Sequence, residues 1–180
     1  MPAVRAEALE DHRLIVWSIE DSRKLYNEGF YGNPLGITKP KPDFEAPLVL
    51  DSVEGTYLVE KGLIEVYSRN KKLDLGDMMQ LSEAHLENFE NKYRVYRDLR
   101  ERGYVVTPGI KYGCDFAVYE EGPGIDHAPY IVQIADSGSR LTALDVVKSG
   151  RLATTVRKSF ILAVVGKDDV RYLEFNWWRA

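Results

Sequence analysis

The chain has 180 residues, of which 44% are hydrophobic, 29% charged and 11% aromatic, with only 14 glycines and 8 prolines. This composition excludes a disordered or collagen-like protein, and the length allows one large domain or two small ones. A formal net charge of −4 argues against a protein that binds nucleic acid over its whole surface, so any RNA or DNA site must be local.

The sequence carries no signal of a membrane or secreted protein. Its longest apolar run, at 160–165, is far shorter than the roughly 20 residues that a membrane helix needs. The start, MPAVRAEALEDH, lacks the apolar core of a signal peptide. The single cysteine, Cys114, can form neither an internal disulfide nor a cysteine-rich zinc site. We therefore expect a soluble, cytoplasmic protein.

Residues 1–90 predict a small mixed α/β domain with a proline-rich inserted loop. The run HRLIVWS at 12–18 is rich in strand formers. Residues 32–47 hold four prolines and two glycines, which exclude a helix and predict a long exposed loop. Because loops of this length in compact domains are often functional, this one is a candidate binding segment.

Two helices are predicted in the following stretch. Asp51 and Glu54 have the spacing of a capping box, which predicts a helix to Lys61 and then a strand at 63–67. A second, amphipathic helix is predicted at 82–102, where apolar residues recur at helical spacing. These residues are Leu86, Phe89, Tyr93, Tyr96 and Leu99. This second helix would link two subdomains.

Residues 91–180 predict an α/β domain in which strands precede and follow a helix. Strands are expected at 104–107, 112–119, 129–135, 160–165 and 170–178, and a helix at 141–158, interrupted or bent at Gly150. This order of strands also suits a restriction-endonuclease-like domain. The fold class is therefore α/β (α+β), with a mixed N-terminal domain and a C-terminal α/β catalytic domain.

A basic cluster accompanies the predicted helix at 141–158. Five cations face a single acid, Asp145, in this part of the chain. The cations are Arg140, Lys148, Arg151, Arg157 and Lys158. If residues 151–158 are helical, Arg151 and Lys158 share one face. The cluster is either a solvated helix face or a local site for an acidic ligand.

Three residues in this domain have side chains suited to cleaving RNA without a metal. Tyr119 ends the strand predicted at 112–119, on its more polar face, and the next loop carries His127. With Lys158, they would supply a base for the 2′-hydroxyl, an acid for the leaving 5′-oxygen and a cation for the phosphorane. Position alone also allows an ordinary surface tyrosine and loop histidine.

Here the sequence resembles the archaeal tRNA splicing endonucleases, from about residue 51 to the end. The resemblance is densest in YRVYRDLRERGYVVTPGIKYGCDFAVY, in HAPYIV and in RLATTVRKSFILAVV. The block YRDLRERGY followed by KYGxDFxxY is its most specific part. Ala128 stands where many relatives have Ser, and Thr154 and Thr155 stand where many have His and Ser.

The resemblance implies roles for individual residues. Tyr119 matches the family's general base, His127 the general acid and Lys158 the lysine that stabilises the transition state. Arg151 matches one of two arginines that sandwich a flipped-out bulge base, and Arg179 is the candidate for the second. On the proline-rich loop, Lys39 and Lys41 match RNA-contacting lysines of crenarchaeal catalytic subunits, and a charged surface loop is the alternative. No cofactor or metal is implied.

The resemblance also implies a substrate and an assembly. The expected substrate is precursor tRNA with a bulge-helix-bulge, cleaved to a 2′,3′-cyclic phosphate and a 5′-hydroxyl. The expected assembly is an α2β2 heterotetramer with a related structural subunit, or alternatively a homotetramer. In it, the strand at 170–178 would pair across subunits, the acidic loop 166–169 would dock on a partner, and Trp177 and Trp178 would lie at an interface.

Two other functions compete with this interpretation. A metal-dependent nuclease would need Asp115 on one strand and an (Asp/Glu)-x-Lys motif on the next. That next strand reads Gln133-Ile134-Ala135, so both the second carboxylate and the lysine are missing. A non-catalytic RNA-binding subunit of the same assembly should have lost part of the triad, which this chain retains.

Overall fold

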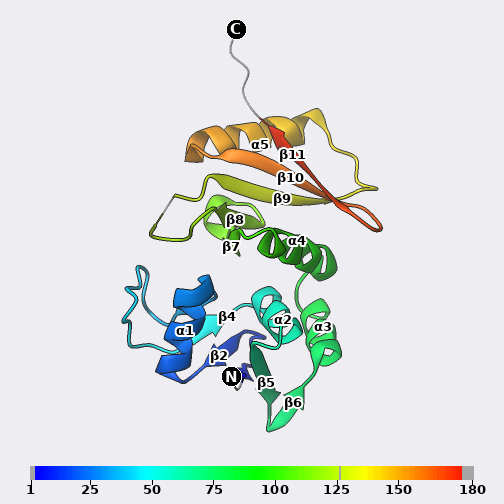
Figure 1. Cartoon of the computed structure of the whole chain (residues 1–180). Helices are drawn as coiled ribbons and strands as arrows, with labels where there is room; N and C mark the ends of the chain where they lie inside the picture. Colours follow the sequence, from blue (N-terminus) through cyan, green and yellow to red (C-terminus); the bar gives the residue numbers. More distant parts are fainter. Residues whose placement is uncertain (1–2, 126, 176–180) are drawn as a thin grey trace. The chain divides into compact units, whose positions relative to one another are not determined.

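The computed structural model describes residues 3–125 and 127–175, and the chain divides into two compact units, 1–93 and 94–180 (Figure 1). Each unit is built on its own mixed β-sheet, so the α/β class predicted from the sequence is confirmed. Arg179, Trp177 and Trp178 lie outside the described residues. In the part of the chain that the structure describes, no helix combines the length and apolar character needed to cross a bilayer.

The first unit has a six-stranded sheet in the order β3-β4-β2-β1-β5-β6. Its elements are β1 (Val4–Ala8), β2 (Leu14–Val16), α1 (Ile19–Gly29), β3 (Asn33–Pro34), β4 (Leu48–Leu50), α2 (Ser52–Glu60), β5 (Ile64–Ser68), β6 (Lys71–Leu73) and α3 (Leu75–Glu83). Strand β1 pairs parallel with β5 and antiparallel with β2. Helix α1 was not anticipated in the sequence, although Ser18 caps it by accepting from the Asp21 amide.

The capping box predicted at the start of α2 is confirmed. The Asp51 carboxylate accepts from the Glu54 amide at 2.8 Å, and Glu54 Oε2 accepts from the Asp51 amide at 3.4 Å. Glu54 is only 2% exposed, and its Oε1 also accepts from the Gly32 amide at 3.1 Å. One buried carboxylate therefore joins the helix start to the beginning of the proline-rich loop.

The proline-rich loop is exposed at its centre, as predicted, and held at its end. Lys39 and Lys41 are exposed. Arg23 of α1 donates to the carbonyls of Asp43 and Phe44, and the Phe44 side chain is buried in the core of the unit. The two lysines thus lie on a loop whose C-terminal part is bound to a helix.

The prediction of a single helix at 82–102 is wrong. The structure has α3, which ends at Glu83, and α4 (Phe89–Glu101), with Asn88 in the left-handed region at φ 59° before α4. The apolar spacing continues across the break, and Leu86, between the two helices, is partly buried although it is not helical. The local signal for α3 was the capping box formed by Asp74 and Asp77.

The second unit has a five-stranded sheet in the order β11-β10-β9-β8-β7. The elements that follow α4 are β7 (Val105–Pro108), a 3₁₀-helix η1 (Ile110–Tyr112), β8 (Phe116–Tyr119), β9 (Tyr130–Asp136), α5 (Ala143–Val156), β10 (Ser159–Val165) and β11 (Val170–Phe175). Strands β9 and β10 are parallel, so α5 must cross between them, and it lies over one face of the sheet (Figure 1). The core between helix and sheet includes Ile131, Ala153 and Phe160.

Two sequence predictions for this unit need correction. The strand predicted at 112–119 begins only at Phe116, because η1 and Gly113, at φ 73°, occupy its first part. Helix α5 runs through Gly150 without interruption, because the Thr142 capping box starts it and Ala153 anchors it in the core. The predicted strand 170–178 is described to Phe175.

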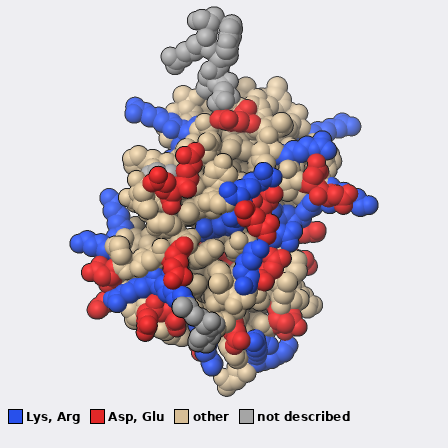
Figure 2. Space-filling model, viewed as in Figure 1, with Lys and Arg blue, Asp and Glu red and all other residues tan. Residues whose placement is uncertain are grey.

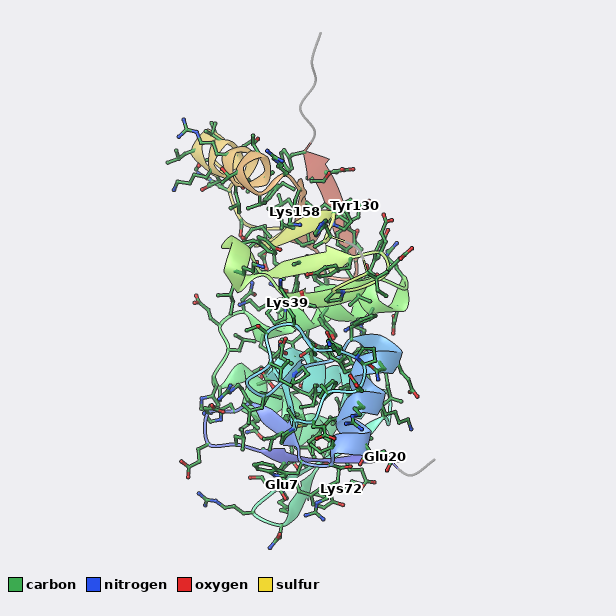
Figure 3. The ribbon with its side chains drawn as sticks, turned by 90° about the vertical axis from the view of Figure 1, so that its left-hand side faces the viewer. Glu7, Glu20, Lys39, Lys72, Tyr130 and Lys158 are labelled. Atoms are coloured by element: carbon green, nitrogen blue, oxygen red, sulfur yellow. The ribbon has the colours of Figure 1, made fainter. Side chains whose placement is uncertain are left out.

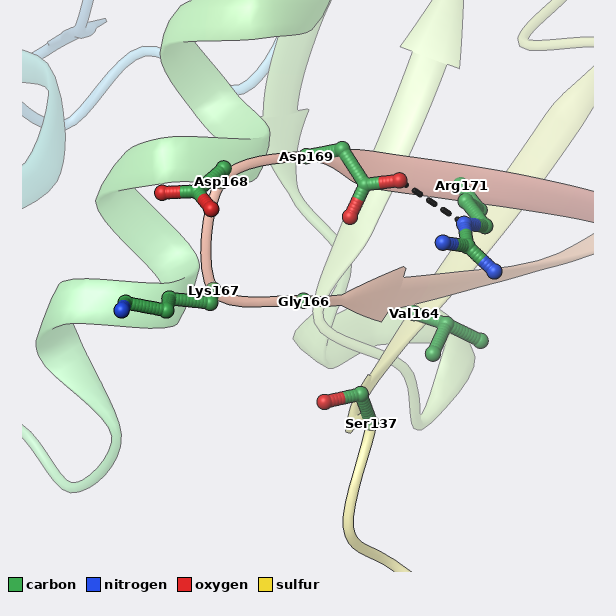
Figure 4. A pocket seen from close by; sticks show the side chains of 7 residues that line it. All are labelled: Ser137, Val164, Gly166, Lys167, Asp168, Asp169 and Arg171. Atoms are coloured by element: carbon green, nitrogen blue, oxygen red, sulfur yellow. Dashed lines mark hydrogen bonds and ion pairs between the residues drawn. The ribbon is translucent and has the colours of Figure 1, made fainter.

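The turn between β10 and β11 is the predicted acidic loop. One of its two aspartates is neutralised by an ion pair. Asp169 pairs with Arg171 at 2.8 Å, as Figure 4 shows. Arg94 of α4 donates to the carbonyls of Gly166 and Lys167 and so fixes the turn to the helix. Together with Ser137 and Val164, the turn lines a pocket (Figure 4).

Candidate active site

The end of β8 and the beginnings of β9 and β10 lie side by side, and these strand ends form one edge of the second sheet. Tyr130, the first residue of β9, pairs with Val118 on one side and with Ser159 on the other. One step further along each strand are Tyr119 at the end of β8 and Lys158 just before β10. Because β8 runs antiparallel to β9, and β10 parallel to it, the end of β8 and the beginnings of β9 and β10 fall in the same row.

Lys158 enters this edge from a sharply turned helix end. Arg157, at φ 54°, ends α5 in the left-handed conformation, and the Lys158 amide donates to Ala153 O at 3.0 Å. The prediction that Arg151 and Lys158 share one helical face is therefore wrong, because the helix ends at Val156. The half-buried Lys158 instead sends its ammonium to the Ala128 carbonyl, which accepts a hydrogen bond from Nζ.

Tyr119 is half-buried at the end of β8, where it pairs with Val105. The next residue, Glu120, accepts a hydrogen bond of 3.2 Å from the hydroxyl of Tyr130. Burial and this hydrogen bond raise the pKa of the Tyr130 phenol, so Tyr130 remains a proton donor to Glu120. Tyr130 was not anticipated from the sequence, because its place between Val118 and Ser159 depends on the pairing of distant strands; Figure 3 labels it and Lys158.

His127 lies in the loop between β8 and β9 and is exposed. Its neighbour Ala128 is 3% exposed and provides the carbonyl that Lys158 binds. The exposed imidazole is therefore adjacent in sequence to a residue, Ala128, that is buried and hydrogen-bonded to Lys158. Together with Tyr119 and Lys158, it forms the candidate active site, and the structure brings the backbone of all three to one end of the sheet.

The predicted basic cluster is largely exposed. Arg140, Lys148, Arg151 and Arg157 are exposed, and Lys158 is half-buried. The Arg151 carbonyl accepts from the Thr155 hydroxyl at 2.8 Å, within regular helix. Elsewhere, acidic and basic side chains are mixed over the face seen in Figure 2. This agrees with a local site better than with a wholly basic surface.

The carboxylate considered for a metal-dependent nuclease has another role in the structure. Asp115 Oδ2 accepts from the Gln133 amide at 2.7 Å and from the Ile134 backbone at 2.8 Å. It therefore braces the chain before β8 against β9. Among the described residues, no three acidic, histidine or cysteine side chains gather as a metal-binding group.

Comparisons with known proteins agree over both units. Residues 89–172 match the family model of the tRNA intron endonuclease catalytic C-terminal domain, and residues 5–79 match that of the N-terminal domain. A tRNA-splicing endonuclease of Hyperthermus butylicus is 46% identical over 169 residues, covering 92% of this chain and 93% of that protein.

Two further relatives give the same result. The tRNA-splicing endonuclease of Sulfurisphaera tokodaii is 43% identical over 92% of this chain and 94% of its own length. That of Saccharolobus solfataricus is 42% identical over 92% of this chain and 93% of its own length. With near-complete coverage at this identity and both domains matched, the chain belongs to the tRNA-splicing endonuclease family.

Proposed function

We propose that this chain is a catalytic subunit that cleaves precursor tRNA at bulge-helix-bulge splice sites, without a metal, to a 2′,3′-cyclic phosphate and a 5′-hydroxyl. The observation that carries the proposal is the arrival of Tyr119, His127 and Lys158 at one edge of the second sheet. Family membership supports an RNA endonuclease of tRNA splicing.

The proposed reaction needs one proton acceptor, one proton donor and one cation. Tyr119 takes the proton of the 2′-hydroxyl as the 2′-oxygen attacks the adjacent phosphorus. The bond from phosphorus to the 5′-oxygen then breaks, and His127 protonates that oxygen as it leaves. Lys158 stabilises the negative charge that accumulates on the phosphorane oxygens. No external water or redox partner is consumed, so the step balances as a transesterification.

We propose that RNA is held by cations outside this triad. Arg151 is exposed on α5, and a planar guanidinium can stack on a flipped-out base. Arg179 is proposed as the second stacking arginine. Lys39 and Lys41 are exposed on the proline-rich loop and are proposed to contact RNA phosphates.

The proposed assembly is an α2β2 heterotetramer with a related structural subunit, and a homotetramer is the alternative. Two copies of the catalytic chain would place two active sites for the two splice sites of an intron. A non-catalytic role for this chain is the second candidate function. The presence of Tyr119, His127 and Lys158 favours catalysis over that role.

The deciding experiment incubates the purified chain with a bulge-helix-bulge RNA, with and without EDTA, alone and after co-expression with a related structural subunit. Fragments ending in a cyclic phosphate and a 5′-hydroxyl are expected. Cleavage by the chain alone would favour the homotetramer, and cleavage only with the second subunit would favour α2β2. Cleavage that occurs only without EDTA would overturn the metal-free mechanism. No cleavage by either preparation, with or without EDTA, would favour the non-catalytic role.

A further inference from the structure

The ammonium group of Lys158 has a second neighbour besides the Ala128 carbonyl. Its Nζ lies over the ring of Tyr112, 5.1 Å from the ring centroid. A cation within about 6 Å of an aromatic face is attracted by the negative potential of the ring. Lys158 is thus held by an aromatic face and by a backbone carbonyl, contributed by two segments distant from it in sequence.

Tyr112 is itself firmly placed. It ends η1, where its amide donates to Gly109 O at 2.8 Å, and its side chain packs against the core between α5 and the sheet. The bend around it is tight, since a Cβ at Gly109 would lie 2.7 Å from both Cys114 O and the Phe116 amide nitrogen. The partly buried ring packs against this core, so moving it away from Lys158 would cost these contacts.

A fixed ring matters because lysine is a flexible side chain on a four-carbon stem. A freely rotating ammonium would spend little time where the phosphorane forms, and catalysis depends on charges placed in advance. We propose that Tyr112 is a positioning residue for Lys158, and that its ring, rather than its hydroxyl, holds the ammonium in place. This inference rests on the proposed role of Lys158 in RNA cleavage.

A neighbouring lysine provides a matched control. Lys111 is exposed, and its Nζ lies 5.5 Å from the centroid of the same ring. Loss of the Tyr112 ring removes both cation contacts, whereas Lys111→Met removes only that of Lys111. The two variants therefore separate an effect through Lys158 from an effect through Lys111.

The test measures single-turnover cleavage and RNA binding in the preparation that cleaves bulge-helix-bulge RNA. Tyr112→Leu is expected to slow cleavage about tenfold while the Kd for RNA stays within about twofold. Tyr112→Phe keeps the ring, and Lys111→Met keeps the Lys158 contact, so both should cleave within about twofold of the unmodified chain. Melting curves verify folding, and Tyr112→Met replaces Tyr112→Leu if the latter does not fold.

A double-mutant cycle provides the decisive readout. In the Lys158→Ala background, Tyr112→Leu is expected to have almost no further effect, because the group it positions is gone. Full independence of the two effects, or unchanged cleavage by a folded Tyr112→Leu or its replacement Tyr112→Met, would overturn the inference. If Lys158→Ala cleaves as fast as the unmodified chain, the proposed role of Lys158 fails first, which distinguishes the two proposals.

Discussion

The Tyr172 hydroxyl donates a hydrogen bond of 2.7 Å to Asp98 Oδ2 and so fastens edge strand β11 to helix α4. The same carboxylate accepts from Arg102 at 2.8 Å. Burial, with the hydrogen bond to Asp98, raises the pKa of the Tyr172 phenol. Burial opposes ionisation of Asp98, but the hydrogen bonds from Arg102 and Tyr172 outweigh it and lower the Asp98 pKa.

Removing this hydroxyl should weaken the fold without touching the candidate active site. Tyr172→Phe is expected to lower the free energy of unfolding by about 1 to 2 kcal/mol, because the half-buried Asp98 carboxylate loses a donor. Urea unfolding at pH 7 measures the loss. Tyr67→Phe is the matched control, since its hydroxyl donates at 3.0 Å to the half-buried Glu65 within the same strand. An equal loss in both variants would contradict a special role for Tyr172.

The pH dependence of stability follows from the same pair. The Asp98 carboxylate, whose pKa is lower in the folded state, contributes stability above its unfolded pKa of about 4, and this is lost as pH falls through the folded pKa. Tyr172, whose pKa is higher when folded, contributes stability that declines above its unfolded pKa of about 10. Tyr172→Phe should flatten the alkaline decline. An unchanged alkaline slope would show that other groups cause it.

The buried carboxylate of Glu54 should be important for the first unit. Glu54→Ala is expected to lower the free energy of unfolding by about 2 to 3 kcal/mol, because the amides of Gly32 and Asp51 both lose their acceptor. Chemical denaturation measures this loss in the free energy of unfolding. Glu87→Ala replaces an exposed glutamate and should change stability by less than about 0.5 kcal/mol. Similar values for both variants would contradict the bridging role of Glu54.

The lone thiol should report on unfolding. Burial raises the pKa of Cys114 to about 11, so little of the reactive thiolate is present in the folded chain at pH 8. Labelling by a disulfide reagent is expected to be at least tenfold slower in the native protein than in 6 M guanidinium, given the shift from a usual pKa of about 8.5. Rapid native labelling at pH 8 would contradict the described burial.

His127→Ala should abolish most cleavage and spare RNA binding. Removal of a general acid typically costs about 10²- to 10⁴-fold in rate, and the exposed side chain makes no contribution to the core. Single-turnover rates and filter binding measure the two effects. His85→Ala, which replaces an exposed histidine of the first unit, is the control and should cleave normally. Normal cleavage by His127→Ala would refute its assignment as the acid.

The two loop lysines, Lys39 and Lys41, should contribute to the salt dependence of RNA binding. Each phosphate contact adds about 0.7 to the slope of log affinity against log salt for single-stranded RNA, so Lys39→Ala with Lys41→Ala should reduce it by about 1.4. The pair Lys71→Ala and Lys72→Ala provides the control, because these lysines face Asp77 and Glu65 on the same unit. Equal slopes for both pairs would place the RNA contacts elsewhere.

Short-range patterns were reliable predictors in this chain. The Asp51 and Glu54 capping box begins a helix as predicted, because both partners lie within one turn and need no distant contact. The prolines of 32–47 likewise exclude a helix through their own geometry. The motif KYGxDFxxY identified the family to which the chain belongs. The positions proposed for catalysis also came from sequence resemblance.

What only the tertiary structure decided involves residues far apart in the chain. The break between α3 and α4 interrupts an apolar spacing that continues beyond it, so periodicity could not reveal it. Lys158 leaves the helix that was expected to carry it and reaches Ala128, 30 residues away, while its ammonium lies over the ring of Tyr112. Local propensity acts through a few neighbouring residues, whereas these contacts exist only because the strands of one sheet pair in a particular order.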